Sequence, residues 1–284
     1  RDWHEVAGWA ADLFRDDGTA ELPGLPATAE PAERTGQALA FVQEHIRYLS
    51  ISLAENSHRP HLPGEVLDKR YGDCKDKSLL LVYWLRRQGI AADPVLVSTQ
   101  YRTLEGLLPS PLLFDHAIVR AVVDGHPYYL DPTNQRQGSR LATLAPALPG
   151  SDALVAAPAT TALARIPPAN PAPAVTNRLR EQVRVDRFGD AATMEVETTH
   201  WGEEAEAVRR NLARLTPQQL RKAYESLLDR RYPQAQLTEA PRIVDDRQEN
   251  RLAVTLQYRI ANLFEQSGDR WSVRYEASNL LDPL

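Results

Sequence analysis

The chain has 284 residues, of which 43% are hydrophobic, and its formal net charge at pH 7 is −5. Basic and acidic residues are interspersed and form no broad positive field, so we expect no nucleic-acid partner. The longest uninterrupted apolar stretch, around residues 79–85, falls far short of the roughly 20 residues that a membrane span needs. A chain of this length is typical of about two globular domains, each able to bury a core.

Helix signals alternate with short extended segments in the first part of the sequence. We predict, in chain order, helices over 3–14 and 32–46, an extended segment over 46–51, a short helix or turn over 62–69, a strand over 92–99 and a loop over 101–113 that is able to cover a site. The chain begins at Arg1 without a methionine, and we interpret it as an excised or mature fragment of a polypeptide.

Cys74 is the single cysteine of the chain, which excludes an internal disulfide and a cysteine-rich metal site. His58 and His61 are three residues apart, but they flank an Arg-Pro pair in a predicted loop rather than sharing a helix face. We therefore expect no metal site and no cofactor.

The cysteine stands where a turn ends and an apolar helix begins. The first turn of a helix offers unpaired N–H groups and a partial positive charge, which favour a thiolate over a thiol. Asp73 and Asp76 have the spacing of a helix cap, and we interpret both carboxylates as capping groups. Their charge opposes thiolate formation, whereas Lys75 and Lys77 favour it. Taken alone, Cys74 would more often be a small buried core residue.

Two apolar runs joined by Asp124-Gly125 follow, and this dipeptide is the strongest short-range signal for a two-residue hairpin turn. Continuing the strand pairing from this turn places Asp131 opposite Ile118. His116 lies two residues further along the same face, roughly 7–8 Å from Asp131 at the backbone. A carboxylate and an imidazole can bridge that distance.

Cys74, His116 and Asp131 together form a candidate catalytic triad. In such a set the thiolate attacks a carbonyl, the imidazole moves the proton, and the carboxylate fixes the imidazole tautomer and steadies the imidazolium. Individually the histidine and the aspartate have ordinary structural explanations, as a satisfied core histidine and a turn residue. The combination of a cysteine at a helix start with a hairpin that carries both partners on one face favours an enzyme.

On these residues the chain resembles the bacterial transglutaminase-like domain family, which has the papain-like cysteine protease fold. The resemblance covers about residues 2–152. The stretches that carry it are 59–60 (RP), 63–67 (PGEVL), 70–77 (RYGDCKDK), 115–116 (DH) and 130–132 (LDP). It implies an α+β catalytic domain with a peptide or protein substrate, located in the bacterial periplasm or cell envelope, with the cytoplasm left open.

Carried over residue by residue, the family's nucleophile falls on Cys74, its general base on His116 and its orienting acid on Asp131. One difference is visible, because Ser57 and His58 stand where many relatives have an aromatic residue before the Arg-Pro pair. That position belongs to a candidate substrate groove, so the specificity of relatives does not transfer to this chain.

An acyl-transfer mechanism also needs hydrogen-bond donors for the oxyanion. The backbone N–H of Cys74 is one candidate donor and the phenol of Tyr48 is another, a packed tyrosine with a satisfied hydroxyl being the alternative. His58 and Arg59 are groove candidates; Arg59 could anchor a substrate carboxylate or make a surface ion pair.

The composition shifts to Ala and Pro after the resembling stretch, and we predict a linker over 153–176. Residues 177–284 predict an accessory α+β domain with a mainly antiparallel sheet. Its predicted elements are strands over 178–185, 192–200, 242–245, 252–260 and 271–275, and helices over 203–215 and 217–230. No nucleophile–base set stands out there, and we expect the domain to present, cover or tether the catalytic one, or to bind a partner.

The sequence thus predicts a papain-like, transglutaminase-like catalytic domain over 1–152, with a helix-start cysteine packed on an antiparallel sheet. We expect a thiol enzyme that acts on amide bonds through a Cys74 acyl-enzyme. Water would attack this acyl-enzyme in a peptidase or amidase, and an amine would attack it in a transglutaminase. The alternatives are a non-catalytic protein- or peptide-binding module that retains the cleft and an acyl-CoA-using acyltransferase.

Overall fold

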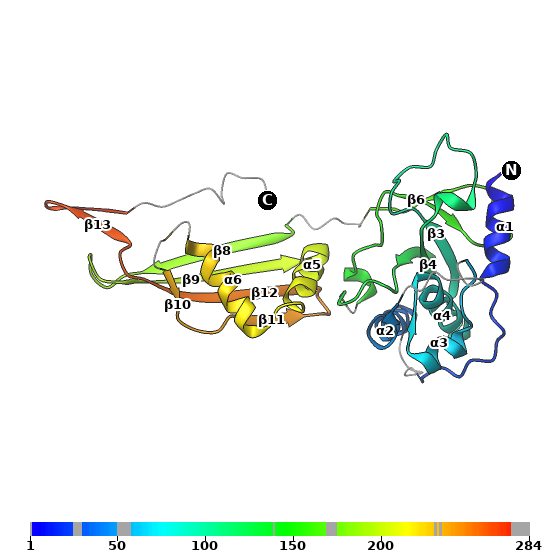
Figure 1. Ribbon diagram of the computed structural model, residues 1–284, viewed down its shortest axis with the longest axis horizontal. Helices are drawn as coiled ribbons and strands as arrows, with labels where there is room; N and C mark the ends of the chain where they lie inside the picture. The colour runs from blue at the N-terminus through cyan, green and yellow to red at the C-terminus, as the bar shows by residue number, and fades with distance from the viewer. Residues whose placement is uncertain are drawn as a thin grey trace. The chain divides into compact units, whose positions relative to one another are not determined.

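Figure 1 presents the computed structural model of the chain, which describes residues 2–24, 30–49, 58–138, 140–168, 175–229, 232 and 235–273. The chain divides into two compact units, Arg1–Pro173 and Ala174–Leu284. Each unit combines helices with a five-stranded antiparallel sheet, which confirms the predicted α+β class.

The α-helices described in the first unit begin at local sequence signals. They are α1 (Trp3–Leu13), α2 (Pro31–His45), α3 (Pro63–Lys69) and α4 (Cys74–Arg87). At the start of α1 the Asp2 side chain accepts a hydrogen bond from the N–H of Glu5, and prolines stand in the first turns of α2 and α3. The predicted helices over 3–14 and 32–46 are confirmed to within one residue.

The sheet of the first unit has the strand order β5-β4-β3-β6-β7. Its strands are β3 (Ala91–Val97), β4 (His116–Val123), β5 (His126–Leu130), β6 (Asp152–Val155) and β7 (Ala164–Arg165). Two short strands, β1 (Arg47–Tyr48) and β2 (Tyr71–Gly72), pair in parallel, and 3-10 helices η2 (Pro111–Leu113) and η3 (Leu141–Thr143) lie in loops. Part of the predicted extended segment 46–51 lies outside the described residues.

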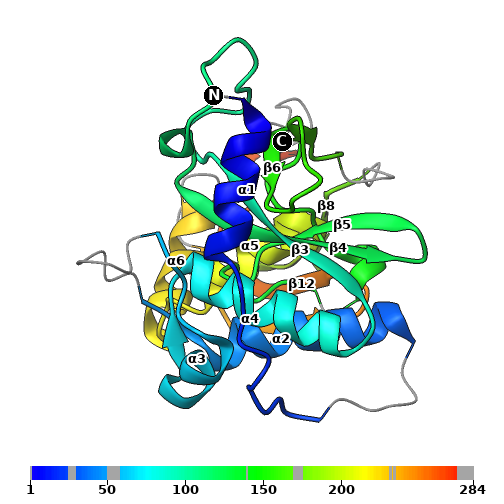
Figure 2. The ribbon, with the colours of Figure 1, turned by 90° about the vertical axis from the view of Figure 1, so that its right-hand side faces the viewer.

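Helix α4 packs on β3 and β4, with α2 and α3 beside it (Figure 1). Helix α1 contacts β6 (Figure 2), and Leu13 at its end packs with Leu79 of α4. Every residue of α4 from Asp76 to Leu85 is buried. Because burying one large apolar side chain contributes roughly 1.5–3 kcal/mol, the helix that carries Cys74 is held firmly against the sheet.

The end of the first unit differs from the sequence prediction. Residues 153–176 predict a linker, but β6 and β7 lie largely in this range and continue the sheet. Val97 pairs with Ala153, and Ile166 is fully buried. Strand β6 is only four residues long and begins with Asp152. It becomes a strand because β3 offers it a free edge, which the local sequence does not reveal.

The second unit has the sheet order β10-β12-β9-β8, with β11 also paired to β12. Its elements are β8 (Asn177–Arg184), β9 (Ala192–Trp201), α5 (Gly202–Leu212), α6 (Pro217–Asp229), β10 (Ala235–Leu237), β11 (Arg242–Asp246) and β12 (Arg251–Ile260), followed by the hairpin of β13 (Phe264–Ser267) and β14 (Arg270–Val273). The predicted mainly antiparallel sheet is confirmed, whereas β10 and β13 were not predicted.

Helices α5 and α6 lie along this sheet (Figure 1) and close its core. Met194, Leu256 and Tyr258 are buried in that core. Within the described ranges, none of the helices combines the length and the apolar character that crossing a membrane requires.

Candidate active site

Cys74 is the first residue of α4, and its side chain is partly exposed. The predicted capping box is present: the Asp73 carboxylate accepts from the N–H groups of Lys75 and Asp76, and the Asp76 carboxylate accepts from the Asp73 N–H. Both carboxylates are thus held by the helix start. No acceptor among the described residues takes the Cys74 N–H, so it is free to bind a ligand oxygen.

Gly72, two residues before the nucleophile, is required by a close approach. A Cβ at this position would lie 2.7 Å from the Cβ of Asp76. Glycine therefore lets the β2 turn pack against the first turn of α4, and this contact fixes the position of Cys74.

The hairpin brings His116 and Asp131 together as predicted. Val123 pairs with His126 across the turn. The Nε2 atom of His116 lies 2.9 Å from Oδ2 of Asp131. Because an ionised carboxylate can only accept, Nε2 carries the proton, which leaves Nδ1 to exchange a proton with the Cys74 thiol.

Asp131 is itself fixed from two sides. Its Oδ1 accepts from the N–H of Thr133 at 2.8 Å and from the Thr133 hydroxyl at 2.7 Å. The Gln43 side chain on α2 donates to the backbone carbonyl of Asp131 at 2.9 Å. Burial raises the pKa of the Asp131 carboxyl, but the bonds from His116 and Thr133 outweigh burial and hold this pKa below its usual value. The carboxylate is therefore ionised at neutral pH.

The His116 ring sits between two anion-forming groups. Burial lowers its pKa, but hydrogen bonds to Asp131 and Cys74, together with the charges of these two groups, raise it to about 10. The arrangement therefore favours a protonated imidazole at neutral pH. A protonated imidazole beside a cysteine side chain can act as a general acid.

Lys77 is fully buried, although the sequence suggests a charge close to the thiol. Its ammonium donates to the carbonyl oxygen of Ile46 at 2.7 Å. Burial lowers the pKa of Lys77 to about 8, with the Asp131 charge acting in the opposite direction. Lys77 therefore lies behind the site and faces its carboxylate.

A pocket of about 200 Å³ opens beside Cys74 and His116. Its apolar wall is formed by α1, β3 and the loop before β4. The side chains of this wall are Trp9, Leu13, Phe14, Leu96, Pro111 and Phe114. Polar groups at the pocket are already engaged: Lys75 pairs with Asp73, and Asp115 accepts from the N–H and hydroxyl of Thr99.

The three candidates beyond the triad lie in different places. His58 lines the pocket and makes an edge-to-face contact with Trp9, with ring centroids 6.0 Å apart. Tyr48 is 45% exposed on β1 and is not among the residues that line the pocket. Arg59 is exposed and also lies outside the lining.

The sequence did not predict the apolar side chains that line the pocket or the hydrogen bonds that Thr133 donates to the Asp131 carboxylate. Trp9 stands off the apolar stripe of α1, and an unexplained tryptophan on a polar helix face is a signal that could have found it. Thr133 follows Asp131 at the spacing of an Asx turn, which is also readable. The burial of Lys77 has no local signal, because its sequence neighbours Asp76 and Ser78 are polar.

Among the described residues, no group of three or more His, Cys, Asp or Glu side chains could hold a metal ion. His61 instead contacts Asp76, whose Oδ1 accepts from the His61 N–H at 2.8 Å.

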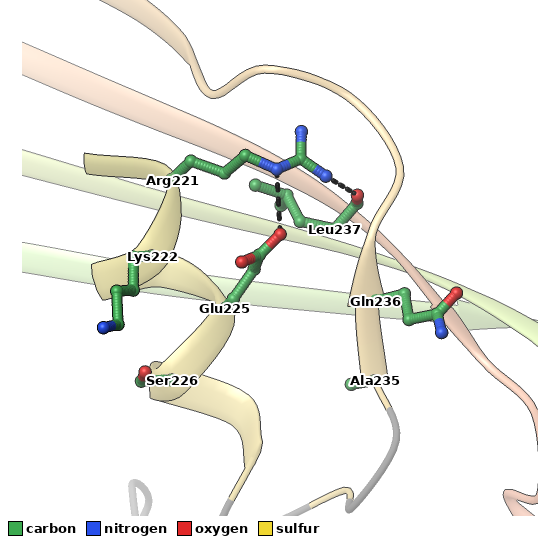
Figure 3. Close-up of a pocket in the computed structure, with 7 residues that line it drawn as sticks. All are labelled: Arg221, Lys222, Glu225, Ser226, Ala235, Gln236 and Leu237. Atoms are coloured by element: carbon green, nitrogen blue, oxygen red, sulfur yellow. Dashed lines mark hydrogen bonds and ion pairs between the residues drawn. The ribbon is translucent and has the colours of Figure 1, made fainter. Parts of the chain in front are cut away.

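A second pocket lies in the second unit, between α6 and β10 (Figure 3). Arg221 spans it, donating to Glu225 at 2.8 Å and to the carbonyl oxygen of Leu237 at 2.7 Å. Lys222 and Ser226 complete its polar lining. The set holds no nucleophile–base pair, and its guanidinium is already bonded.

No protein-family model matches this chain, and no curated protein matches its sequence. Two solved structures are similar to it. One, a candidate protease from Parabacteroides distasonis, aligns with 91% of this chain and 48% of its own, at a TM-score of 0.37 and 12% identity. The other is a candidate cysteine protease from Cytophaga hutchinsonii. It aligns with 46% of this chain and 37% of its own, at a TM-score of 0.28 and 17% identity.

The chain therefore spans less than half the length of either protein. Both likenesses are too weak to assign a fold family or an activity.

Proposed function

We propose that the first unit is a thiol enzyme of the papain-like, transglutaminase-like type that acts on amide bonds of peptides or proteins. The observation that carries the proposal is the position of His116, which bonds to Asp131 at 2.9 Å, lines the same pocket as Cys74, and has its pKa raised by both neighbours. A buried, ionised carboxylate, an oriented imidazole and a thiol at a helix start are the parts of a nucleophilic triad.

In the first half-reaction the Cys74 thiolate attacks the amide carbonyl carbon, and a C–S bond forms. The imidazolium of His116 gives its Nδ1 proton to the leaving nitrogen, and the C–N bond breaks. An amine departs and a thioester remains on Cys74. The free Cys74 N–H at the positive end of α4 is suited to bind the oxyanion between these steps. Tyr48 as a second donor stays a prediction.

In the second half-reaction His116 takes a proton from water or from an amine, which attacks the thioester carbonyl. The C–S bond breaks, the thiolate returns, and the imidazolium forms again beside it. Water yields a carboxylic acid and an amine yields a new amide. The second unit would act as an accessory domain to this chemistry.

The alkylation rate of Cys74 by iodoacetamide between pH 5 and 9 tests the proposal. The wild type should react rapidly near pH 6, because the reagent needs only a thiolate, and His116→Ala should lose roughly tenfold or more of that rate. His126→Ala is the matched control, since His126 is exposed on the same hairpin. A wild-type rate that rises only near the ordinary thiol pKa of about 8.5 would refute the thiolate–imidazolium pair.

Turnover is a separate test. A mixture of peptides should be cleaved, or coupled to an added primary amine, by the wild type and not by Cys74→Ala. Free acid as the product identifies hydrolysis, and an amine adduct identifies transfer. If both proteins leave every peptide unchanged while alkylation is fast, the thiol is activated but the amide chemistry is not supported.

A further inference from the structure

The loop between β3 and β4 exposes leucines beside the candidate active site. Leu108 is 88% exposed and Leu112 is 86% exposed. Leu107 is 44% exposed in the same loop. Contiguous exposed apolar side chains on a folded protein commonly mark a binding surface.

Hydrogen bonds hold this loop in place at both ends. At its start, the Asp152 carboxylate accepts from the Leu104 N–H at 2.7 Å, and Leu104 is itself fully buried. At its end, the Asp115 carboxylate accepts from the Thr99 N–H at 2.7 Å. The leucines between these anchors are thus presented outward by a fixed frame and do not fold back onto the core.

The same loop also builds the pocket next to the nucleophile. Pro111, adjacent to Leu112, lines the pocket together with Phe114, and Trp9 and Phe14 face them from α1 and the residue after it. Cys74 lines the same pocket. A chain that fills the pocket and continues across the loop would therefore meet this apolar wall and then the exposed leucines.

The charged side chains that line the pocket also favour an apolar substrate. Apart from His116, the charged side chains that line the pocket, Lys75 and Asp115, are engaged with Asp73 and Thr99. A charged substrate side chain would lose its water in this pocket without gaining an ion pair from either of them, which is unfavourable.

We propose that the acyl donor is an apolar peptide segment. The pocket takes the apolar side chain next to the reacting carbonyl, and Leu108 and Leu112 bind the apolar residues that flank it. This inference rests on the proposed thiol chemistry. It adds the substrate class, and it makes the two leucines specificity-determining residues.

Two peptidyl chloromethyl ketones that differ only in the residue beside the warhead, Phe or Asp, test this. The Cys74 thiolate displaces chloride from the methylene carbon and forms a thioether, so labelling needs no turnover. The Phe probe should label the wild type at least tenfold faster than the Asp probe. When the residues that flank this position in the probe are leucines, the Phe probe should label Leu108→Ser/Leu112→Ser about tenfold more slowly than the wild type, while iodoacetamide reacts as in the wild type. Leu227→Ser, at a leucine 59% exposed on α6, is the control and should change neither rate.

The outcomes separate the two proposals. Slow iodoacetamide labelling of the wild type means that the activated thiol is wrong, whatever the peptides do. Fast iodoacetamide labelling with equal rates for the two peptide probes overturns the apolar donor alone. A wild-type dimer that the double serine variant loses, with unchanged labelling by the Phe probe, would mean that a second copy covers the leucines, and this also overturns the inference.

Discussion

The buried ammonium of Lys77 donates a hydrogen bond of 2.7 Å to the carbonyl oxygen of Ile46. The bond ties α4, one turn after Cys74, to the residue that follows α2. The Asp131 charge acts on the same ammonium. One side chain therefore links the nucleophile's helix, the segment before β1 and the carboxylate of the candidate triad.

Lys77→Met should reveal the cost of burying this charge. Because burial lowers the pKa of Lys77 from 10.5 to about 8, the unfolded chain binds more protons than the folded one between these values. Wild-type stability should therefore rise relative to Lys77→Met as the pH increases through 8. Between pH 7 and 9.5 the gain should be about 2 kcal/mol, measured by urea unfolding.

Ser78→Ala is the control for this pH dependence. It removes a buried hydrogen bond of 3.0 Å from the neighbouring residue of α4 to the carbonyl oxygen of Ala117, with no change in charge. Its loss of stability should be the same at both pH values. If the difference in unfolding free energy between the wild type and Lys77→Met were equally independent of pH, it would contradict the lowered pKa of Lys77.

Asp131→Asn should lower the pKa of His116. Burial already disfavours the imidazolium, and the bond to the Asp131 carboxylate is the largest of the opposing contributions that keep the pKa of His116 at about 10. An NMR titration of the His116 ring should show the shift downward, and turnover should fall roughly 100-fold or more. The alkaline limb of the turnover profile should move to lower pH, because the general acid is lost earlier.

Asp115→Asn is the matched variant for this experiment. Asp115 neighbours His116 in sequence, but its carboxylate is directed to Thr99 and Gln100. The variant should leave the His116 titration nearly unchanged. An equal shift in both variants would mean that general negative charge, and not the bond to Asp131, sets the pKa of the imidazole.

Local sequence signals predicted the parts of the site that depend on short-range geometry. The capping box around Cys74 follows from residue spacing alone. The Asp124-Gly125 turn adopts positive φ angles of 51° and 78°, so the dipeptide fixes the register that brings His116 to Asp131. The capping box joins residues that are close in the sequence, and the approach of His116 to Asp131 needs only one hairpin.

Features that depend on distant segments escaped prediction. The edge of β3 turns residues 152–155 into a strand, and α1 brings Trp9 to the pocket from the other end of the unit. Lys77 is buried only because Ile46 offers it a carbonyl. Such long-range packing overrides the local pattern and is not encoded at the residue itself.

Gly72→Ala should disturb the nucleophile without touching it. The added Cβ would lie 2.7 Å from the Cβ of Asp76, so the turn or α4 must shift. We expect a loss of about 1–3 kcal/mol in unfolding free energy and slower alkylation of Cys74. Gly8→Ala, in α1 with nothing within 4 Å of a new Cβ, should be neutral or stabilising. Equal behaviour of the two variants would rule out the close approach as the reason for glycine.

Arg209→Ala should destabilise the second unit. The buried guanidinium donates to Asp245 at 2.7 Å and to Asn250 at 2.6 Å, and Asn250 donates in turn to the buried Glu206. Removing the cation leaves a buried carboxylate in a broken network, which costs on the order of 3 kcal/mol. Hydrogen exchange in β11 and β12 should accelerate accordingly. Arg214→Ala, at an exposed arginine just beyond α5, should change exchange little, and similar acceleration in both variants would disprove a stabilising network.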